Sequence, residues 1–383
     1  DSPPRDRLVQ VNNLTLDFYE CRLTDSWARN YIADRFGQDL AGTTYRPGYA
    51  PDGWTGLVHH LRRQGVSDDE MLEAGVALRA STGRLIDRFR DRAMFPITDP
   101  NNTAVLGFVG RRNPAHGDED RHGPKYLNTA ETALFSKGDQ LYVAGKLTPD
   151  TVPVITEGPF DALAVTIATG GSHIGVAALG TSLTVQQVLQ LHGQQRPIVA
   201  TDPDFAGRVA AERDYWLLTS QGHDPSLAVL PDGFDPADLI ASGRTGELAA
   251  ALHSGRPLAE TLIDERLDHL AANPAAIEAV GVLAAQPPEQ WTAGAEYISN
   301  RAGVPSSVIR SALVGMTRHW NADRRRAAEH QLAQAGQVKQ RLAAAASGAA
   351  SARLPERSDA ATRWGRSRKD PSPAPGRPVS LDR

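Results

Sequence analysis

Carboxylate side chains follow three apolar runs in the middle of the chain, where strand-like patterns change to helix-like patterns. These carboxylates are Glu157, Asp161, Asp202, Asp204 and Asp235. In an open α/β sheet such strand ends lie along one edge, where ligands bind. Acids gathered there need counter-charge, and hard carboxylate oxygens suit Mg²⁺ or Mn²⁺. The spacing therefore predicts a divalent-metal site at this edge, and ions held in this way serve phosphoryl or nucleotidyl transfer.

The aspartates are also suited to begin helices, because an Asp side chain accepts hydrogen bonds from the first backbone N–H groups of a helix. A single Asp would be interpreted as such a cap. Three acidic motifs at successive strand ends, each interrupted by Gly or Pro, favour the metal site instead. In the Asp202-x-Asp204 pair, Pro203 favours a turn that lets both side chains point the same way.

Residues 152–256 alternate between strand-like and helix-like patterns, which is typical of a mainly parallel sheet with helices on its faces. The predicted strands are 152–156, 174–179, 197–201 and 227–230, and the predicted helices are 160–168, 184–191, 206–221 and 236–242. The acidic motifs then fall at strand ends of a single sheet.

The N-terminal part combines helices with short strands. Residues 1–40 show helical periodicity, and we expect a packed lead-in there rather than catalytic residues. The segments 89–97 and 104–111 are predicted as neighbouring strands joined by a turn. Basic residues are frequent between 88 and 137. From the pattern alone, they could line a groove for nucleic-acid phosphates or belong to an ordinary surface of mixed charge.

Beyond residue 257 the chain becomes helical and Ala-rich. We expect a helical segment followed by a charged helix and a disordered tail, because the tail is rich in Ser, Pro and Arg and poor in apolar residues. The predicted divisions are 1–147, 148–256, 257–320, 321–346 and 347–383.

Composition excludes several classes of protein. The 383 residues carry a formal net charge of −4, which argues against a uniformly basic nucleic-acid coat. The single cysteine, Cys21, excludes a disulfide framework and a Cys-rich zinc module, so we expect no zinc in this chain. No apolar run reaches membrane-spanning length, and no signal peptide is evident. We expect a cytoplasmic protein without a membrane partner.

Together the acidic motifs resemble the TOPRIM domain shared by bacterial-type primases, topoisomerases and certain nucleases. The motifs are Glu157-Gly158-Pro159-Phe160-Asp161 and Asp202-Pro203-Asp204. The segments that resemble the primase branch of that family are 178–184, 204–211 and 230–236 within the predicted sheet region, and 48–54, 89–97, 107–111 and 124–137 upstream. The resemblance to DnaG-type primases covers roughly residues 14–313.

The resemblance implies an α+β N-terminal primase subdomain, an α/β TOPRIM domain with a mainly parallel sheet, and a helical C-terminal subdomain. It implies an enzyme that synthesises short RNA primers from NTPs on single-stranded DNA, as the 3′-hydroxyl attacks the α-phosphate. Glu157 would be the acid/base that also organises the metal, Asp202 and Asp204 the principal metal ligands, and Asp161 and Asp235 supporting acids. The implied contacts to nucleotide or template are Arg111, Lys125, Asn128, Lys137 and Arg208.

The chain also departs from the family pattern. The second acid of the last motif, Asp238, lies one position later than usual, which leaves its role open. The zinc-binding and helicase-binding domains of replicative primases are not evident, so we expect either a fragment or a primase-like protein of another system. The protein partners that the resemblance implies are a replicative helicase or a separate zinc-binding module.

Two other functions remain as alternatives. A TOPRIM nuclease or topoisomerase-like enzyme would break strands, although no strand-cleaving tyrosine domain is recognisable. A non-catalytic accessory protein would bind single-stranded DNA without priming, although the main acids are all present.

Overall fold

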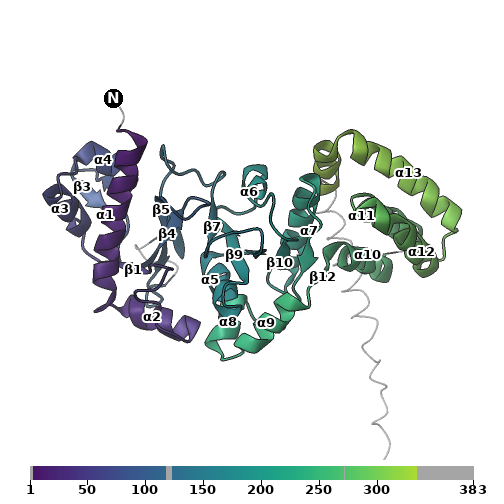
Figure 1. The fold of residues 1–383 in the computed structure, drawn as a ribbon, viewed down its shortest axis with the longest axis horizontal. Coiled ribbons are helices and arrows are strands. Elements are labelled where there is room, and N and C mark those ends of the chain that lie inside the picture. The colour runs from purple at the N-terminus through teal and green to yellow at the C-terminus, as the bar shows by residue number, and fades with distance from the viewer. Residues whose placement is uncertain (1–2, 118–122, 271, 334–383) are drawn as a thin grey trace, which may run out of the picture.

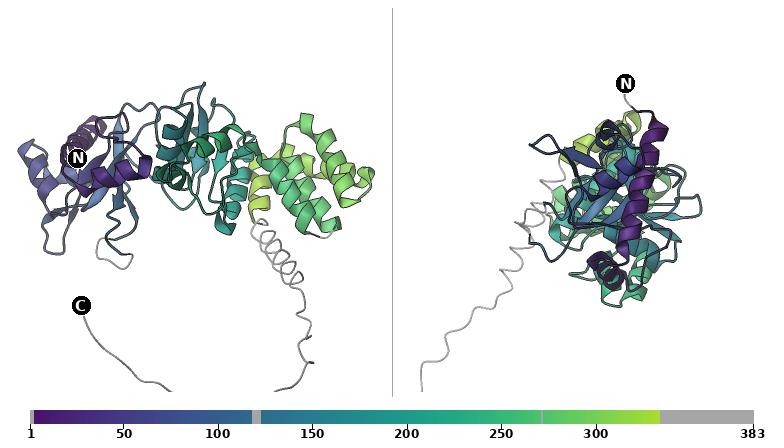
Figure 2. Two further views of the ribbon diagram at one scale, coloured as in Figure 1. Left: turned by 90° about the horizontal axis from the view of Figure 1, so that it is seen from below. Right: turned by 90° about the vertical axis from the view of Figure 1, so that its left-hand side faces the viewer.

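The structure is a computed structural model that describes residues 3–117, 123–270 and 272–333. It consists of three parts in a row, an N-terminal unit, a central unit built on a sheet, and a C-terminal group of helices (Figures 1 and 2). The predicted tail, 347–383, and the second half of the predicted charged helix, 321–346, lie outside the described residues. Within the described part of that helix, residues 324–333 are helical.

The N-terminal unit packs helices against a small antiparallel sheet. Its elements are α1 (Arg5–Leu23), α2 (Trp27–Phe36), β1 (Gly48–Ala50), α3 (Gly56–Arg63), α4 (Asp68–Glu73), β2 (Ala77–Arg79), β3 (Leu85–Asp87), β4 (Arg92–Thr98), β5 (Val105–Arg112) and β6 (Tyr126–Asn128). The sheet has the order β1-β4-β5-β6, and the predicted pairing of the two long strands is present as β4 and β5. The strands β2 and β3 form a separate hairpin-like pair.

The central unit has a six-stranded sheet in the order β12-β11-β10-β8-β9-β7. Its elements are β7 (Leu141–Val143), β8 (Val152–Thr156), α5 (Pro159–Ala168), β9 (His173–Ala178), α6 (Val185–Leu189), β10 (Ile198–Ala200), α7 (Phe205–Ser220), β11 (Ser226–Leu227), α8 (Pro236–Ala241), α9 (Thr245–His253) and β12 (Arg256–Pro257). The four inner strands are parallel, whereas the edge strands β7 and β12 pair antiparallel. The predicted, mainly parallel sheet with helices on its faces is therefore confirmed. The strand predicted at 227–230 is shorter in the structure, where β11 covers only Ser226–Leu227.

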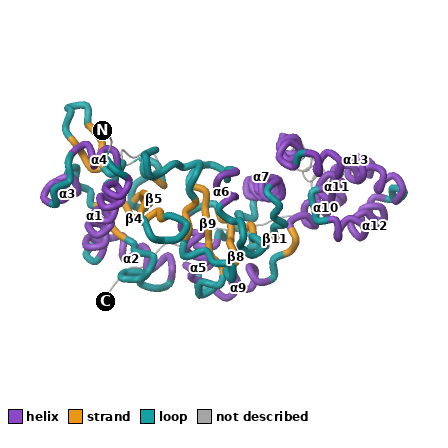
Figure 3. The backbone as a smooth tube through the Cα atoms, turned by 45° about the horizontal axis from the view of Figure 1, so that its top comes forward, coloured by secondary structure: helices purple, strands orange, loops and turns teal. Residues whose placement is uncertain are grey.

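Alternate side chains of each inner strand enter different cores, as the two-residue period of a strand requires. Val154 faces the core that contains α5, α8 and α9, whereas Ile155 faces the core that contains α6, α7 and the C-terminal helices. The C-terminal elements are α10 (Leu258–His269), α11 (Ala272–Ala284), the short helix η1 (Pro288–Gln290), α12 (Trp291–Ala302) and α13 (Ser306–Ala322). Figure 3 shows this all-helical part beside the central strands.

Phe160, on the first turn of α5, joins the N-terminal and central units. Its buried ring lies 5.4 Å from the ring of Phe36 on α2 and 5.4 Å from that of Phe95 on β4, measured between centroids. The rings of Tyr31 and Tyr126 lie 5.9 Å and 6.0 Å away. Aromatic pairs at these separations add to the stabilisation that burial gives. Phe160 therefore holds α2 and the N-terminal sheet against the edge of the central sheet that carries the acids.

Among the described residues, none of the helices combines the length and the apolar content that a bilayer crossing requires.

Candidate metal and nucleic-acid site

Glu157 and Asp202 lie side by side at the carboxyl ends of neighbouring strands. The first directly follows β8, and the second follows β10, which pairs parallel to β8. The Glu157 Oε1 atom accepts a hydrogen bond from the backbone N–H of Asp202 over 3.1 Å. Glu157 is exposed and Asp202 is half-buried. Parallel pairing thus brings together two acids that are 45 positions apart in the sequence.

Asp204 stands at the start of α7, where it acts as the helix cap. Its Oδ1 atom accepts a hydrogen bond of 2.7 Å from the backbone N–H of Gly207, and the residue is exposed. A Cβ atom on Gly207 would lie 1.9 Å from the carbonyl oxygen of Asp202. Only glycine therefore lets the first turn of α7 pack directly on the backbone of the Asp-x-Asp motif.

Asp161 and Asp235 meet at the start of α8. Asp235 caps this helix by accepting a hydrogen bond of 2.5 Å from the backbone N–H of Asp238. The backbone N–H of Ala237 lies 3.4 Å from Asp161 Oδ1, so the first and last acidic motifs share one helix end. We call Glu157, Asp161, Asp202, Asp204, Asp235 and Asp238 the acidic edge.

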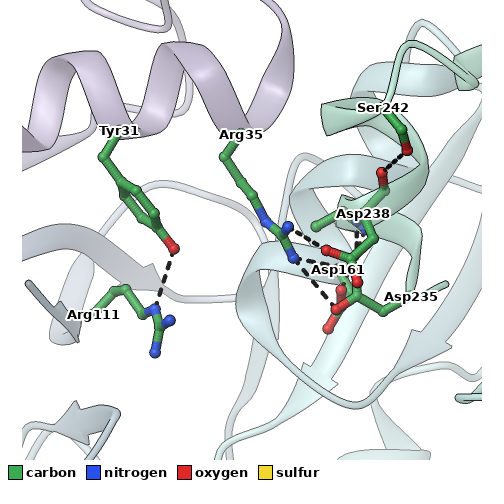
Figure 4. A network of polar contacts seen from close by, with 8 residues as sticks. Tyr31, Arg35, Arg111, Asp161, Asp235, Asp238 and Ser242 are labelled. Atoms are coloured by element: carbon green, nitrogen blue, oxygen red, sulfur yellow. Dashed lines mark hydrogen bonds and ion pairs between the residues drawn. The ribbon is translucent and has the colours of Figure 1, made fainter. Parts of the chain in front are cut away.

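Arg35 enters the acidic edge from α2 of the N-terminal unit. One of its terminal nitrogens, Nη1, donates to Asp238 Oδ1, and the other, Nη2, lies 3.2 Å from Asp235 Oδ1. Figure 4 shows the guanidinium between these two carboxylates, with Asp161 beside them. The side chain of Arg35 is 23 % exposed, so it is screened by water less than a surface arginine.

Mutual repulsion is evident in the pKa values of the acidic edge. Partial burial raises the pKa of Asp202 to about 6, and the charges of Glu157, Asp235, Asp204 and Asp238 add to that rise. Burial also raises the pKa of Asp161, and the charges of Asp235 and Asp202 add to that rise, although Arg35 opposes it. The edge therefore carries more negative charge than its own cation balances.

The donor chemistry fits a hard divalent cation, because every candidate ligand is a carboxylate oxygen and the excess charge is negative. The positions of the side chains do not form a metal site as they stand. Among residues 3–117, 123–270 and 272–333, no three His, Cys, Asp or Glu side chains are close enough together to hold a metal ion. Five of the six carboxylates are already engaged: Glu157, Asp204, Asp161 and Asp235 accept from the backbone N–H groups of Asp202, Gly207, Ala237 and Asp238, and Arg35 contacts Asp235 and Asp238. Carboxylates would therefore have to exchange these partners for the ion.

Arg111 is positioned by aromatic residues beside Arg35. It lies on β5 and is half-buried, and its Nε atom donates to the hydroxyl of Tyr31 over 3.3 Å. Its guanidinium carbon lies 5.2 Å from the centre of the Tyr126 ring, a cation–π distance. Tyr31 belongs to the same helix as Arg35, so one helix arranges both cations (Figure 4).

The other predicted nucleic-acid residues differ in their surroundings. Lys125, Lys137 and Arg208 are exposed, and Arg208 lies on the first turn of α7, next to Asp204. The side-chain amide of Asn128 donates to the carbonyl oxygen of Leu179 over 2.7 Å, and the backbone carbonyl oxygen of Asn128 accepts from Arg88. In this structure Asn128 therefore links β6 to the loop after β9.

Sequence reasoning missed Arg35, because residues 1–40 were expected to be only a packed lead-in. It also left the role of Asp238 open, and the structure pairs these two residues. The available signal was weak, namely that Tyr31 and Arg35 are four positions apart and so share one face of a helix. Nothing in the sequence indicates which surface that face meets.

Comparison with known families gives two matches that follow one another along the chain. Residues 18–147 match the family described as the N-terminal domain of the DNA primase catalytic core. Residues 154–240 match the Toprim-like family. The Toprim domains of primases bind divalent metal, in agreement with the donor chemistry of the acidic edge.

Individual relatives agree with these matches. The DNA primase of Deinococcus radiodurans is 36% identical over 255 residues, which are 65% of this chain and 43% of that protein. The RNA polymerase domain of Mycobacterium tuberculosis primase DnaG, solved with double-stranded DNA, superimposes with a TM-score of 0.66 at 27% identity. That alignment covers 79% of this chain and 99% of the solved one. A DnaG primase catalytic domain bound to single-stranded DNA aligns with a TM-score of 0.65 at 26% identity, over 79% of this chain and 98% of that one.

This chain spans less than half the length of the curated relatives that it matches, for example 43% of the Deinococcus protein and 45% of the Escherichia coli primase. The aligned part is the catalytic core, in which a primase N-terminal domain precedes a Toprim domain. The chain belongs to the DnaG-type primase family.

Proposed function

We propose that this chain is a metal-dependent nucleotidyltransferase that synthesises short RNA primers on single-stranded DNA from NTPs. The observation that carries the proposal is the meeting of opposite charges at one junction. The acidic edge of the central unit lies against the face of the N-terminal unit that presents Arg35 and Arg111. A reaction between a hydroxyl and a triphosphate needs both, since acids hold metal ions and basic residues hold phosphates.

In the proposed reaction, the 3′-oxygen of the growing strand forms a bond to the α-phosphorus of the incoming NTP. The bond from that phosphorus to the bridging oxygen breaks, and pyrophosphate leaves. A divalent ion, Mg²⁺ or Mn²⁺, held by these acids would lower the pKa of the attacking hydroxyl and neutralise charge on the leaving group. Glu157, exposed beside Asp202, takes the proton and helps Asp202 and Asp204 to hold the ion. Asp161 and Asp235 support this arrangement from the start of α8.

Basic residues on both sides of the junction would hold the phosphates of template and nucleotide. Arg111 is suited to this role because Tyr31 and Tyr126 already orient its guanidinium. The exposed side chains of Lys125, Lys137 and Arg208 can follow a flexible strand at little cost. Asn128 remains a proposed contact, although its amide already bonds Leu179.

The test is a primer-synthesis assay with single-stranded DNA, radiolabelled NTPs and either Mg²⁺ or Mn²⁺. We expect short RNA products from the wild-type chain and none from Asp202→Ala, because the substitution removes a proposed metal ligand whose carboxylate lies among the charges of the other acids. Asp150→Ala is the matched control, since Asp150 is an exposed aspartate outside the site, and it should keep full activity. Thermal unfolding should show that all three proteins are folded.

Two other outcomes would refute the proposal. DNA breakage without NTP incorporation would favour the strand-breaking alternative, which the primase match at residues 18–147 disfavours. DNA retention with neither activity would indicate a binding accessory. A helicase or a separate zinc-binding module as partner stays a prediction, and addition of either to the same assay would measure its effect.

A further inference from the structure

Arg35 makes a two-armed contact that spans the last acidic motif. Its Nη1 atom donates to Asp238, and its Nη2 atom lies 3.2 Å and 3.3 Å from the two carboxylate oxygens of Asp235. A guanidinium fork is well suited to this, because its N–H groups are fixed in one plane. Asp235 thus has both oxygens engaged by a side-chain cation, while one of them also caps α8.

The helix that carries Arg35 is held rigidly, so the contact is built into the fold. At its start, Trp27 Nε1 donates to Asp91 Oδ1 over 2.5 Å. At its end, the buried ring of Phe36 packs on Phe160, and Gly37 closes the helix in the left-handed conformation at φ 66°. Arg35 therefore reaches the acidic edge from a helix that is fixed at both ends.

The acidic edge consequently divides into two ends with different charge balance. At one end, Glu157 and Asp204 accept hydrogen bonds from backbone N–H groups, and among the described residues no ion pair is made by Glu157, Asp202 or Asp204. Arg208, the basic residue next to Asp204, donates to the carbonyl oxygen of Pro203. At the other end, Arg35 supplies a full positive charge to Asp235 and Asp238. A divalent ion meets least competition at the first end.

We propose that Arg35 is a positioning residue that occupies the Asp235–Asp238 end of the acidic edge as a built-in cation and competes there with a divalent ion. The inference rests on the proposed metal-dependent function and deepens it. A first ion binds at the Glu157–Asp202 end, and an ion reaches Asp235 only as Arg35 withdraws. Two cations cannot both take the same carboxylate oxygens, so removal of Arg35 makes the edge bind metal more tightly.

A purely structural role for Arg35 predicts the opposite result. If the arginine only ties α2 to α8, then its loss loosens the junction, spreads the acids apart and leaves metal binding unchanged or weaker. The affinity for a metal ion, measured without DNA or nucleotide, therefore separates the two roles.

The experiment is a calorimetric titration of the full chain with Mn²⁺ at pH 7.5. For Arg35→Gln we expect an affinity on the order of tenfold higher than that of the wild type, equivalent to about 1.4 kcal/mol. Arg29→Gln is the matched control, because Arg29 lies on the same helix and pairs with the exposed Asp39 away from the edge. Its Mn²⁺ affinity should equal that of the wild type.

Arg35→Lys keeps the charge and a single tether but cannot span both carboxylates, so its affinity should lie between those of wild type and Arg35→Gln. Thermal unfolding shows whether Arg35→Gln is folded. If it is not, the Mn²⁺ affinity of Arg35→Lys relative to the wild type tests the inference in its place. Unchanged or weaker Mn²⁺ binding in the folded variants overturns the inference while leaving the proposed function intact. If neither wild type nor variants bind Mn²⁺, the metal-dependent function and this inference both fall.

Discussion

Asp214 is a buried acid on α7 that lies outside the acidic edge, and we expect its ionisation to make the stability of the folded protein depend on pH. It is 4 % exposed, and the Nε atom of Arg213 lies 3.7 Å from Asp214 Oδ1, too far for a hydrogen bond. Burial raises the pKa of Asp214 to about 7, from 3.8 for an ordinary aspartate; Arg213 opposes the rise and Glu157 adds to it. Asp214→Asn should therefore stabilise the protein at alkaline pH, because an amide avoids the cost of a buried charge.

The size and sign follow from proton linkage. Between pH 3.8 and about 7, the folded state holds a proton that the unfolded chain has lost, so stability falls as the pH rises through this window. At 1.36 kcal/mol for each pH unit, the cost above pH 7 approaches about 4 kcal/mol. The gain from Asp214→Asn should be close to that figure at pH 8 and about half of it or less at pH 5.

Urea unfolding followed by circular dichroism at pH 5 and pH 8 measures both quantities. Asp150→Asn serves as the control, because Asp150 is exposed and its substitution should change stability by less than about 0.5 kcal/mol. The reasoning is refuted if Asp214→Asn destabilises the protein at pH 8, or if its effect is the same at the two pH values.

Two further substitutions test the packing that positions the site. Gly207→Ala would place a Cβ atom 1.9 Å from the carbonyl oxygen of Asp202, so we expect at least tenfold weaker Mn²⁺ binding by calorimetry, whereas Gly246→Ala, with no atom within 4 Å of the added Cβ, should bind normally. An unaltered affinity in Gly207→Ala would show that the Asp-x-Asp backbone is not held by α7. Phe160→Ala should cost about 3–5 kcal/mol in unfolding free energy, because it removes a buried ring from the junction of two units. A loss as small as that of Phe205→Ala, where the ring is 44 % exposed, would contradict this account of the junction.

Most of the local architecture could be predicted from the sequence, because it depends on short-range periodicity. The apolar runs that end at Glu157 and Asp202 are strands that pair parallel, and parallel pairing places their ends at one edge whatever surrounds them. Asp204 and Asp235 begin helices as well as standing at that edge, so the cap and the metal interpretations of these residues do not exclude each other.

The tertiary structure alone decided what faces the acidic edge. Arg35 contacts Asp238 across 203 positions of sequence, and the packing of α2 on Phe160 determines that contact. The same holds for Asn128, whose amide meets the carbonyl oxygen of Leu179 because β6 lies at the edge of one sheet next to another. Periodicity shows which side of an element is apolar, whereas the identity of the surface it covers depends on long-range packing that no local pattern encodes.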